Sequence, residues 1–171
     1  ATRELSIELT ARMLLLAGVA ASIETARSCV TEKLESGEAL EKFRQNVELQ
    51  GGDPRICDDP SMLLQLDLVE HAILSSGNGF VSEIDTLAIG NAIVEIGGGR
   101  TRAEDLIDSG VGYSASVVTG DAVEKGTLLG ILYCRSDIQA KRIGEKLVAA
   151  YTIVSENVQP LDLIKAVIGA E

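Results

Sequence analysis

Aromatic residues and positive charge are scarce in this chain. Aromatic side chains make up 3% of its 171 residues and none is Trp, so there is little on which single-stranded nucleic acid could stack. Acidic residues outnumber basic ones, 26 against 15, and the net charge of −11 repels phosphate backbones and anionic membranes. We therefore expect neither nucleic acid nor a membrane as a partner.

Cysteine and histidine are too few and too scattered for a disulfide framework or a zinc site. Cys29, Cys57 and Cys134 are far apart, no pair forms a CxxC motif, and His71 is the single histidine. This pattern predicts reduced thiols. The apolar run from Met13 to Ala17 is far too short to span a bilayer, and no secretory signal opens the chain. The sequence thus predicts a cytoplasmic protein without metal.

The first third of the chain has the periodicity of helices. Thr2 is a suitable N-cap for a first helix, which Gly18 ends. Ser22 suits a second helix that stops near Gly37, and a third helix is expected over 38–50. Apolar residues lie on several faces of the first helix, so it must be covered on more than one side. Where those faces stay uncovered, we expect the chain to self-associate.

Beyond Leu66 the pattern changes to short apolar runs separated by glycine. VEHAILSS (69–76) and GFVSEI (79–84) predict two strands joined as a hairpin across 77–79. The remaining expected elements are a helix capped by Asp85 or Thr86 and running to Ile96, strands at VGYSASVV and GTLLGILYC, a helix over 136–150 and a short final strand. The predicted class is α+β: a helical segment, 1–66, then a β-rich module with two helices, 67–171.

Three consecutive glycines in IGGGR (96–100) raise the question of an anion-binding loop. Such a loop follows a strand and opens a helix, so that free N–H groups face the anion. Here the glycines follow a helix, as C-capping glycines do, and no Walker lysine is present. The stretch favours a structural corner, where Gly98→Val would destabilise the fold strongly if φ is positive. Arg100 and Arg102 are expected to form a solvated ion-pair cluster with nearby acids: Glu95, Glu104, Asp105 and Asp108.

The other polar residues of interest have structural explanations. His71 lies in an apolar strand, with no Asp, Ser or Cys at a spacing that suggests a triad. Asp58 and Asp59 stand beside a proline in a turn, and turn chemistry accounts for both. No residue type or spacing here forms a catalytic constellation.

The stretch GDAVEKGTLLGILYC (120–134) resembles the half-motif of biotinyl and lipoyl carrier domains. Those domains present a modified lysine at the tip of the next hairpin. The candidate in this chain, Lys141, falls on a predicted helix. The resemblance therefore implies a barrel-sandwich-like or hammerhead-like β-architecture more than a carrier function.

A longer stretch carries a second resemblance. GFVSEIDTLAIGNAIVEIGGGRTRAEDLIDSGVG (79–112), followed by GDAVEKGTLLGILY (120–133), is similar to the C-terminal domain of the thymidine and pyrimidine-nucleoside phosphorylases. Upstream, residues 3–54 resemble the helices that precede that domain, with a Leu-rich helix and a Gln-Gly-Gly-Asp turn in the same order. The likeness covers nearly the whole chain.

The resemblance implies a pentosyltransferase, in which a pyrimidine deoxynucleoside and phosphate give the free base and deoxyribose 1-phosphate. The whole enzymes of this family are homodimers in which a helical and an α/β domain close on the substrates; phosphate is a co-substrate and no cofactor is needed. Residues 1–66 would be the remainder of the α/β domain, and 67–171 the C-terminal domain.

The family's catalytic motifs are missing from these 171 residues. Neither the glycine-rich phosphate loop nor the Ser-x-Arg and Gly-Gly-Thr-x-Asp signature occurs in the chain. The resemblance therefore assigns no catalytic, substrate-binding or metal-binding role to any position, and we expect the chain alone to be inactive. Two alternatives stay open: a biotinyl- or lipoyl-like carrier module, and the C-terminal part of an AMP phosphorylase.

Overall fold

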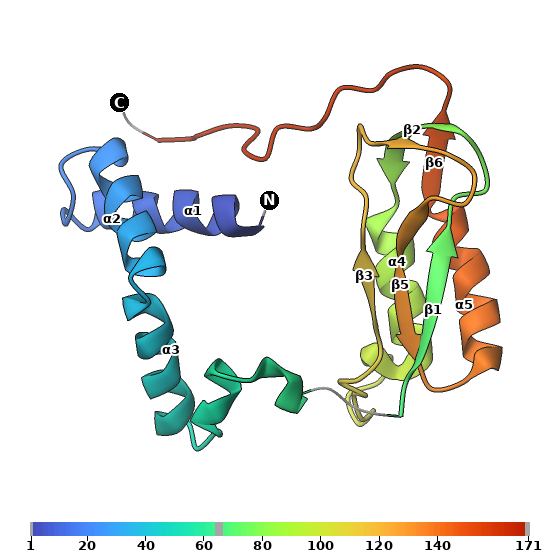
Figure 1. Cartoon of the computed structure of the whole chain (residues 1–171), viewed down its shortest axis with the longest axis horizontal. Helices are drawn as coiled ribbons and strands as arrows, with labels where there is room; N and C mark the ends of the chain where they lie inside the picture. Colours follow the sequence, from blue (N-terminus) through green and yellow to red (C-terminus); the bar gives the residue numbers. More distant parts are fainter. Residues whose placement is uncertain (1, 64–66, 170–171) are drawn as a thin grey trace. The chain divides into compact units, whose positions relative to one another are not determined.

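The computed structural model of the chain describes residues 2–63 and 67–169 (Figure 1). These residues group into two compact units. The helical unit comprises residues 2–63 and 162–169, and the α+β unit comprises residues 67–161. Each unit is described in turn.

Capping residues and glycines define the helices of the helical unit. The Ser22 hydroxyl accepts a hydrogen bond from the Thr25 amide at 3.2 Å, which confirms the predicted cap. Gly37, with φ of 83°, separates the second helix from the third. Thr2 already lies in the first helix, so its prediction as N-cap is wrong. The elements are α1 (Thr2–Leu16), α2 (Ile23–Glu35), α3 (Glu38–Leu49), and the 3-10 turns η1 (Pro54–Cys57) and η2 (Pro60–Leu63).

Helix α1 packs against α2 and leaves much of its apolar surface in solvent. Ala11 and Ala26 are fully buried where the two helices meet. Leu9, Met13 and Leu16, by contrast, are 55%, 67% and 88% exposed. The sequence predicted apolar residues on several faces of this helix. Among the described residues, only the face that contains Ala11 is buried.

The α+β unit contains two separate antiparallel sheets of three strands. One has the order β1-β5-β3 and the other β4-β2-β6. The α+β class is confirmed, and the described strands close no barrel. The strands are β1 (Val69–Leu74), β2 (Gly79–Ile84), β3 (Gly112–Ala115), β4 (Ala122–Val123), β5 (Leu128–Cys134) and β6 (Tyr151–Val154).

The predicted hairpin between β1 and β2 is wrong, although both strands exist. β1 pairs with β5, and β2 pairs with β4 and β6. Ser75, at the end of β1, bonds through its amide to the Thr127 carbonyl at 2.8 Å and accepts from the Gly126 amide at 2.9 Å. These bonds tie β1 to the turn before β5, so the Gly77–Gly79 segment carries the chain from one sheet to the other.

Two helices complete the α+β unit; the first begins at one of the two predicted caps, and the second begins one residue after its predicted start. Asp85 accepts from the Ala88 amide at 2.8 Å ahead of α4 (Thr86–Ile93), and Ser136 caps α5 (Asp137–Ala149). α4 continues into a π-helical turn, η3 (Val94–Gly98). α5 packs on β1 and β5 and also contacts α4 (Figure 1). The core draws on both sheets and both helices: Ile73, Val81, Ala92, Leu129, Leu132, Ile143 and Leu147.

Candidate functional site

The three glycines form a tight corner at the end of η3. Gly97 has a φ of 98°, a conformation that side chains rarely tolerate, and its carbonyl accepts the Asp108 amide at 2.8 Å. Gly98 has no positive φ; a Cβ there would lie 2.5 Å from Ile93 Cγ2 and 3.3 Å from Val111 Cγ2. Gly97 therefore permits the turn, and Gly98 permits close packing. The positive φ considered for Gly98 in the sequence occurs instead at Gly97.

Gly98→Val should still destabilise the α+β unit, by roughly 2–4 kcal/mol, because the added carbons overlap Ile93 and its carbonyl. Gly90→Ala in α4 is the matched control. A Cβ at Gly90 meets nothing within 4 Å, so this change should be neutral or stabilise by up to about 1 kcal/mol. Urea unfolding followed by tyrosine fluorescence measures both. Equal midpoints for Gly98→Val and wild type would contradict the packing argument.

The charges around this corner pair differently from the sequence-based expectation. Asp108 receives two hydrogen bonds of 2.8 Å from Arg135, the residue after β5. Glu95 pairs with Lys146 and, at 3.3 Å, with Arg142, both on α5. The predicted cluster centred on Arg100 and Arg102 is thus wrong, because cations 27 to 51 residues away along the chain reach these acids.

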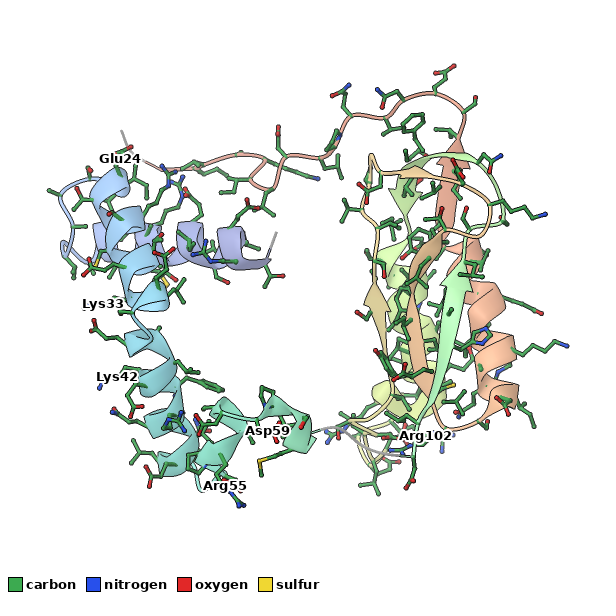
Figure 2. The ribbon with its side chains drawn as sticks, in the orientation of Figure 1. Glu24, Lys33, Lys42, Arg55, Asp59 and Arg102 are labelled. Carbon is green, nitrogen blue, oxygen red and sulfur yellow. The ribbon has the colours of Figure 1, made fainter. Side chains whose placement is uncertain are left out.

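Arg100 and Arg102 themselves are exposed. Within the described ranges no ion pair involves either side chain. Asp105, also expected in the cluster, accepts the backbone amides of Thr101 and Arg102 at 3.0 and 2.9 Å and so closes the loop locally. Figure 2 shows Arg102 on this loop, at one end of the strands. Two exposed cations on a loop closed by its own carboxylate do not enclose an anion.

The Asp108–Arg135 pair should make the α+β unit sensitive to acid. The bonds from Arg135 and the Gly110 amide lower the pKa of Asp108 to about 2, against about 3.9 in an unfolded chain. Because the folded-state pKa is the lower one, the stabilisation is complete above about pH 4 and is lost as the pH falls toward about 2. Asp108→Asn should therefore be less stable than wild type at neutral pH, and the two proteins should converge near pH 2. A constant difference in urea midpoint across this range would contradict the assignment.

His71 lies half-buried in β1, where it faces α5. A Cβ at Gly144 would lie 3.1 Å from His71 Nε2, so the ring packs closely over this glycine. The two residues contribute to an open groove of about 670 Å³ between β1 and α5. Lys141 and Glu145 are its charged lining residues, and neither makes a triad with His71.

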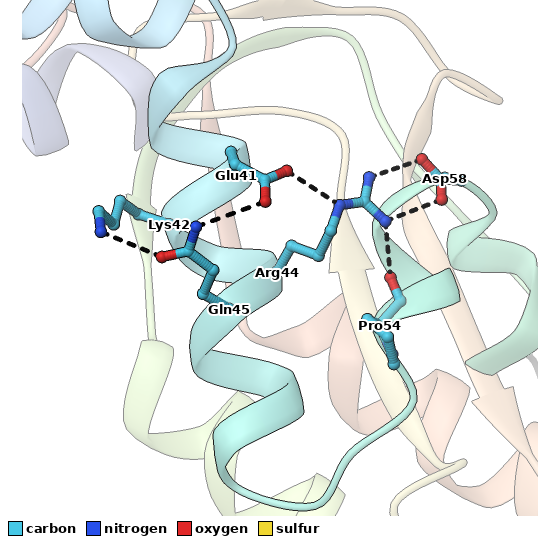
Figure 3. A network of polar contacts seen from close by, with 6 residues as sticks. All are labelled: Glu41, Lys42, Arg44, Gln45, Pro54 and Asp58. Carbon is cyan, nitrogen blue, oxygen red and sulfur yellow. Dashed lines mark hydrogen bonds and ion pairs between the residues drawn. The ribbon is translucent and has the colours of Figure 1, made fainter.

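Asp58 and Asp59 serve the turns after α3. Arg44 donates to both Asp58 carboxylate oxygens, at 2.7 and 2.8 Å, and to the Pro54 carbonyl at 3.2 Å (Figure 3). This bidentate contact lowers the pKa of Asp58. Asp59 instead accepts the Ser61 amide at 3.1 Å. The two neighbouring carboxylates thus have separate structural partners and face no common substrate position.

Sequence reasoning missed an ion cluster around the buried Glu8 in the helical unit. Glu8, on the buried side of α1, receives hydrogen bonds from Arg27 at 2.7 and 3.0 Å and from Arg12 at 2.5 Å. These contacts lower its pKa, with the Arg27 hydrogen bond as the main cause. Glu8 lies within an apolar helix and Arg12 follows four residues later, so the sequence could have predicted this one pair. The partner from α2 could not be read from spacing.

A second missed contact joins two tyrosines of the α+β unit. The Tyr113 and Tyr151 hydroxyls lie 2.9 Å apart, one on β3 and the other on β6. Burial and this hydrogen bond raise the pKa of Tyr113 far above its usual value. The pair links the two sheets through polar atoms.

The cysteines and Lys141 are the remaining candidate residues, and the described part of the chain groups none of them into a site. Cys29, Cys57 and Cys134 are free thiols, and no group of three metal-binding side chains gathers within 2–63 or 67–169. Lys141 lies on α5, as expected, and not at the tip of a hairpin. In the part of the chain that the structure describes, no helix has the length and apolar character needed to cross a bilayer.

Comparison with known proteins shows which family this chain resembles. Residues 80–154 match the family model of the pyrimidine nucleoside phosphorylase C-terminal domain. The chain is 33% identical, over 96% of its length, to a thymidine phosphorylase of Burkholderia cenocepacia, and 35% identical over 95% to a pyrimidine-nucleoside phosphorylase of Geobacillus stearothermophilus. It spans 37% of the length of each of these relatives. Over nearly its whole length the chain thus matches the C-terminal portion of the thymidine and pyrimidine-nucleoside phosphorylase family.

Proposed function

We propose that this chain is the scaffold portion of a nucleoside phosphorylase, which converts a pyrimidine nucleoside and phosphate into the free base and a pentose 1-phosphate. Similarity over 96% of the chain to proteins named thymidine phosphorylase is the observation that carries the proposal. The reacting groups would be supplied by polypeptide outside these 171 residues.

The charge arrangement of the described residues supports a scaffold role. Phosphorolysis needs cations and N–H donors preorganised around the phosphate. Most of the described basic side chains are instead paired with carboxylates of the same unit: Arg3, Arg12, Arg27, Lys33, Arg44, Arg55, Arg135, Arg142 and Lys146. Each of these pairs places a carboxylate beside the cation, and its negative charge disfavours a phosphate at the same position.

Two assays test the proposal. The isolated chain, incubated with phosphate and either thymidine or uridine, should release no free base. A chimera in which the chain replaces the corresponding portion of the Geobacillus stearothermophilus enzyme should release base under the same conditions. Turnover by the isolated chain would refute the scaffold role, and a folded but inactive chimera would refute the family function.

The carrier-module alternative makes a different prediction. Expression in a host with active biotin and lipoate ligases would add a covalent group to a carrier lysine. Because Lys141 lies in the middle of α5, we expect the intact mass to equal that of the unmodified chain.

A further inference from the structure

An asparagine followed by glycine lies on the segment that links the two sheets. Asn78 and Gly79 form the only Asn-Gly pair of the sequence, because every other asparagine precedes Val or Ala. The asparagines are all exposed, so access to solvent does not distinguish them: Asn46, Asn78, Asn91 and Asn157. The following residue does, since glycine has no Cβ and lets its amide nitrogen approach the preceding side chain closely.

The fold itself imposes this pair of residues. Gly79 has a φ of 146°, and a Cβ there would lie 2.1 Å from the Val154 carbonyl oxygen of β6, so position 79 requires glycine. Asn78 has a separate structural role. Its Oδ1 accepts the backbone amide of Lys125 at 2.7 Å and so ties the link between the sheets to the turn before β5.

The Lys125 amide lies where it also assists a reaction of Asn78. When the Gly79 nitrogen attacks the Asn78 side-chain carbon Cγ, negative charge develops on Oδ1. An N–H group 2.7 Å from that oxygen stabilises the charge, as the donors of an oxyanion hole do. Gly79 pairs with Val123 of β4, a strand of two residues, and local opening of so short a ladder frees the attacking nitrogen.

The turn that carries Lys125 is held by bonds that do not involve β4. The Glu124 carbonyl accepts the Thr127 amide at 2.9 Å across the turn, and Gly126 has a φ of 92°. Ser75, at the end of β1, holds the same turn through the two hydrogen bonds described above. The donor therefore stays in place while the ladder between β2 and β4 opens.

We propose that Asn78 is a site of spontaneous deamidation, with the Lys125 amide as the assisting donor. The Gly79 nitrogen forms a bond to Cγ, the bond from Cγ to the side-chain nitrogen breaks, and that nitrogen leaves as ammonia with the Gly79 proton. Water then opens the succinimide ring at either carbonyl and gives aspartate or isoaspartate. No electron is transferred and both reacting groups belong to adjacent residues. Ring closure therefore depends neither on a partner nor on the proposed function.

The two products should differ in stability. Aspartate keeps a carboxylate oxygen that accepts the Lys125 amide. Isoaspartate adds a carbon atom to the main chain directly before Gly79, where the Val154 carbonyl oxygen leaves no space for the backbone to shift. Asn78→Asp should therefore match wild type in urea midpoint, whereas the isoaspartate form, purified from aged protein, should unfold at a lower urea concentration.

Ageing of the folded protein in water enriched in heavy oxygen tests the site. Ring opening places the heavy isotope in the new carboxylate, and peptide mapping by mass spectrometry follows each asparagine separately. Asn78 should convert at least about tenfold faster than Asn157, an exposed asparagine outside helices and strands that precedes Val158. This comparison needs no variant. Equal rates at the two positions, or no conversion at Asn78, would overturn the proposal.

Lys125→Pro tests the donor. Proline has no N–H, and it suits the second position of a turn whose third position is a glycine of positive φ, here Gly126. Conversion of Asn78 should slow by roughly threefold to tenfold in the folded variant and should equal that of wild type when both are unfolded in urea. Lys125→Ala keeps the backbone amide and is the matched control, with an expected rate equal to that of wild type. Unchanged or faster conversion in folded Lys125→Pro would overturn the assisting role.

Discussion

Gly79→Ala should unfold the α+β unit or destabilise it by more than about 4 kcal/mol, a large part of the stability of an ordinary domain. A Cβ at Gly79 would lie 2.1 Å from the Val154 carbonyl oxygen and 3.1 Å from Ile153 Cγ2, and φ is 146°. The oxygen belongs to the backbone of β6, the strand next to β2, so no side-chain rotation can relieve the overlap. The change would separate β2 from β6 at the point where the chain enters this sheet.

Tyrosine fluorescence reports on this unit alone. The three tyrosines, Tyr113, Tyr133 and Tyr151, all lie in the α+β unit, and the chain has no Trp. Gly77→Ala is the control: it lies two residues earlier, without positive φ, and its Cβ would meet nothing within 4 Å. Its urea midpoint should match that of wild type. A Gly79→Ala midpoint close to the control would show that β6 can move away at little cost.

Gly130→Ala should be the second most damaging substitution, with a loss of about 3 kcal/mol or more. A Cβ there would lie 2.3 Å from the Tyr113 hydroxyl oxygen and 2.5 Å from the Ser114 carbonyl oxygen. Tyr113 crosses β5 at this glycine to reach the Tyr151 hydroxyl, 2.9 Å away. Moving the ring aside breaks that bond and still leaves the overlap with the β3 backbone.

A spectroscopic titration separates loss of this contact from a general loss of stability. In wild type the raised pKa of Tyr113 keeps its phenol protonated where ordinary tyrosines ionise, and ultraviolet absorbance follows the ionisation. In folded Gly130→Ala, one more tyrosine should ionise near the usual value of about 10. Gly112→Ala on β3 is the control, because its Cβ would meet nothing within 4 Å. Identical titrations of Gly130→Ala and wild type would contradict the role given to Gly130.

Local features of the α+β unit were predicted more successfully than its pairings. Asp85 was one of two predicted caps, and the prediction was possible because a capping side chain bonds to an amide three residues away, within the same short stretch. The hairpin across 77–79 failed although its residues suit a turn. The partners that β1 and β2 bury against, β5 and β6, are distant in sequence, and turn residues permit a hairpin without requiring one.

The polar candidate residues show the same difference between local contacts and contacts distant in sequence. Asp105 closes its own loop, a contact within four residues, whereas Asp108 and Glu95 take partners from β5's end and from α5. Glu8 shows the limit most clearly, since two of its three hydrogen bonds come from Arg27, nineteen residues away. Spacing along one helix indicates which side chains share a face, but not which element covers that face.

The amino-acid sequence alone indicated most of the helices and strands, the caps Ser22 and Asp85, the α+β class and the family resemblance, because each depends on contacts within a few residues or on order along the chain. The tertiary structure decided strand pairing, the different roles of Gly97 and Gly98, and the distant cations that pair with Glu8, Glu95 and Asp108. Those depend on which distant backbone lies within a few ångströms.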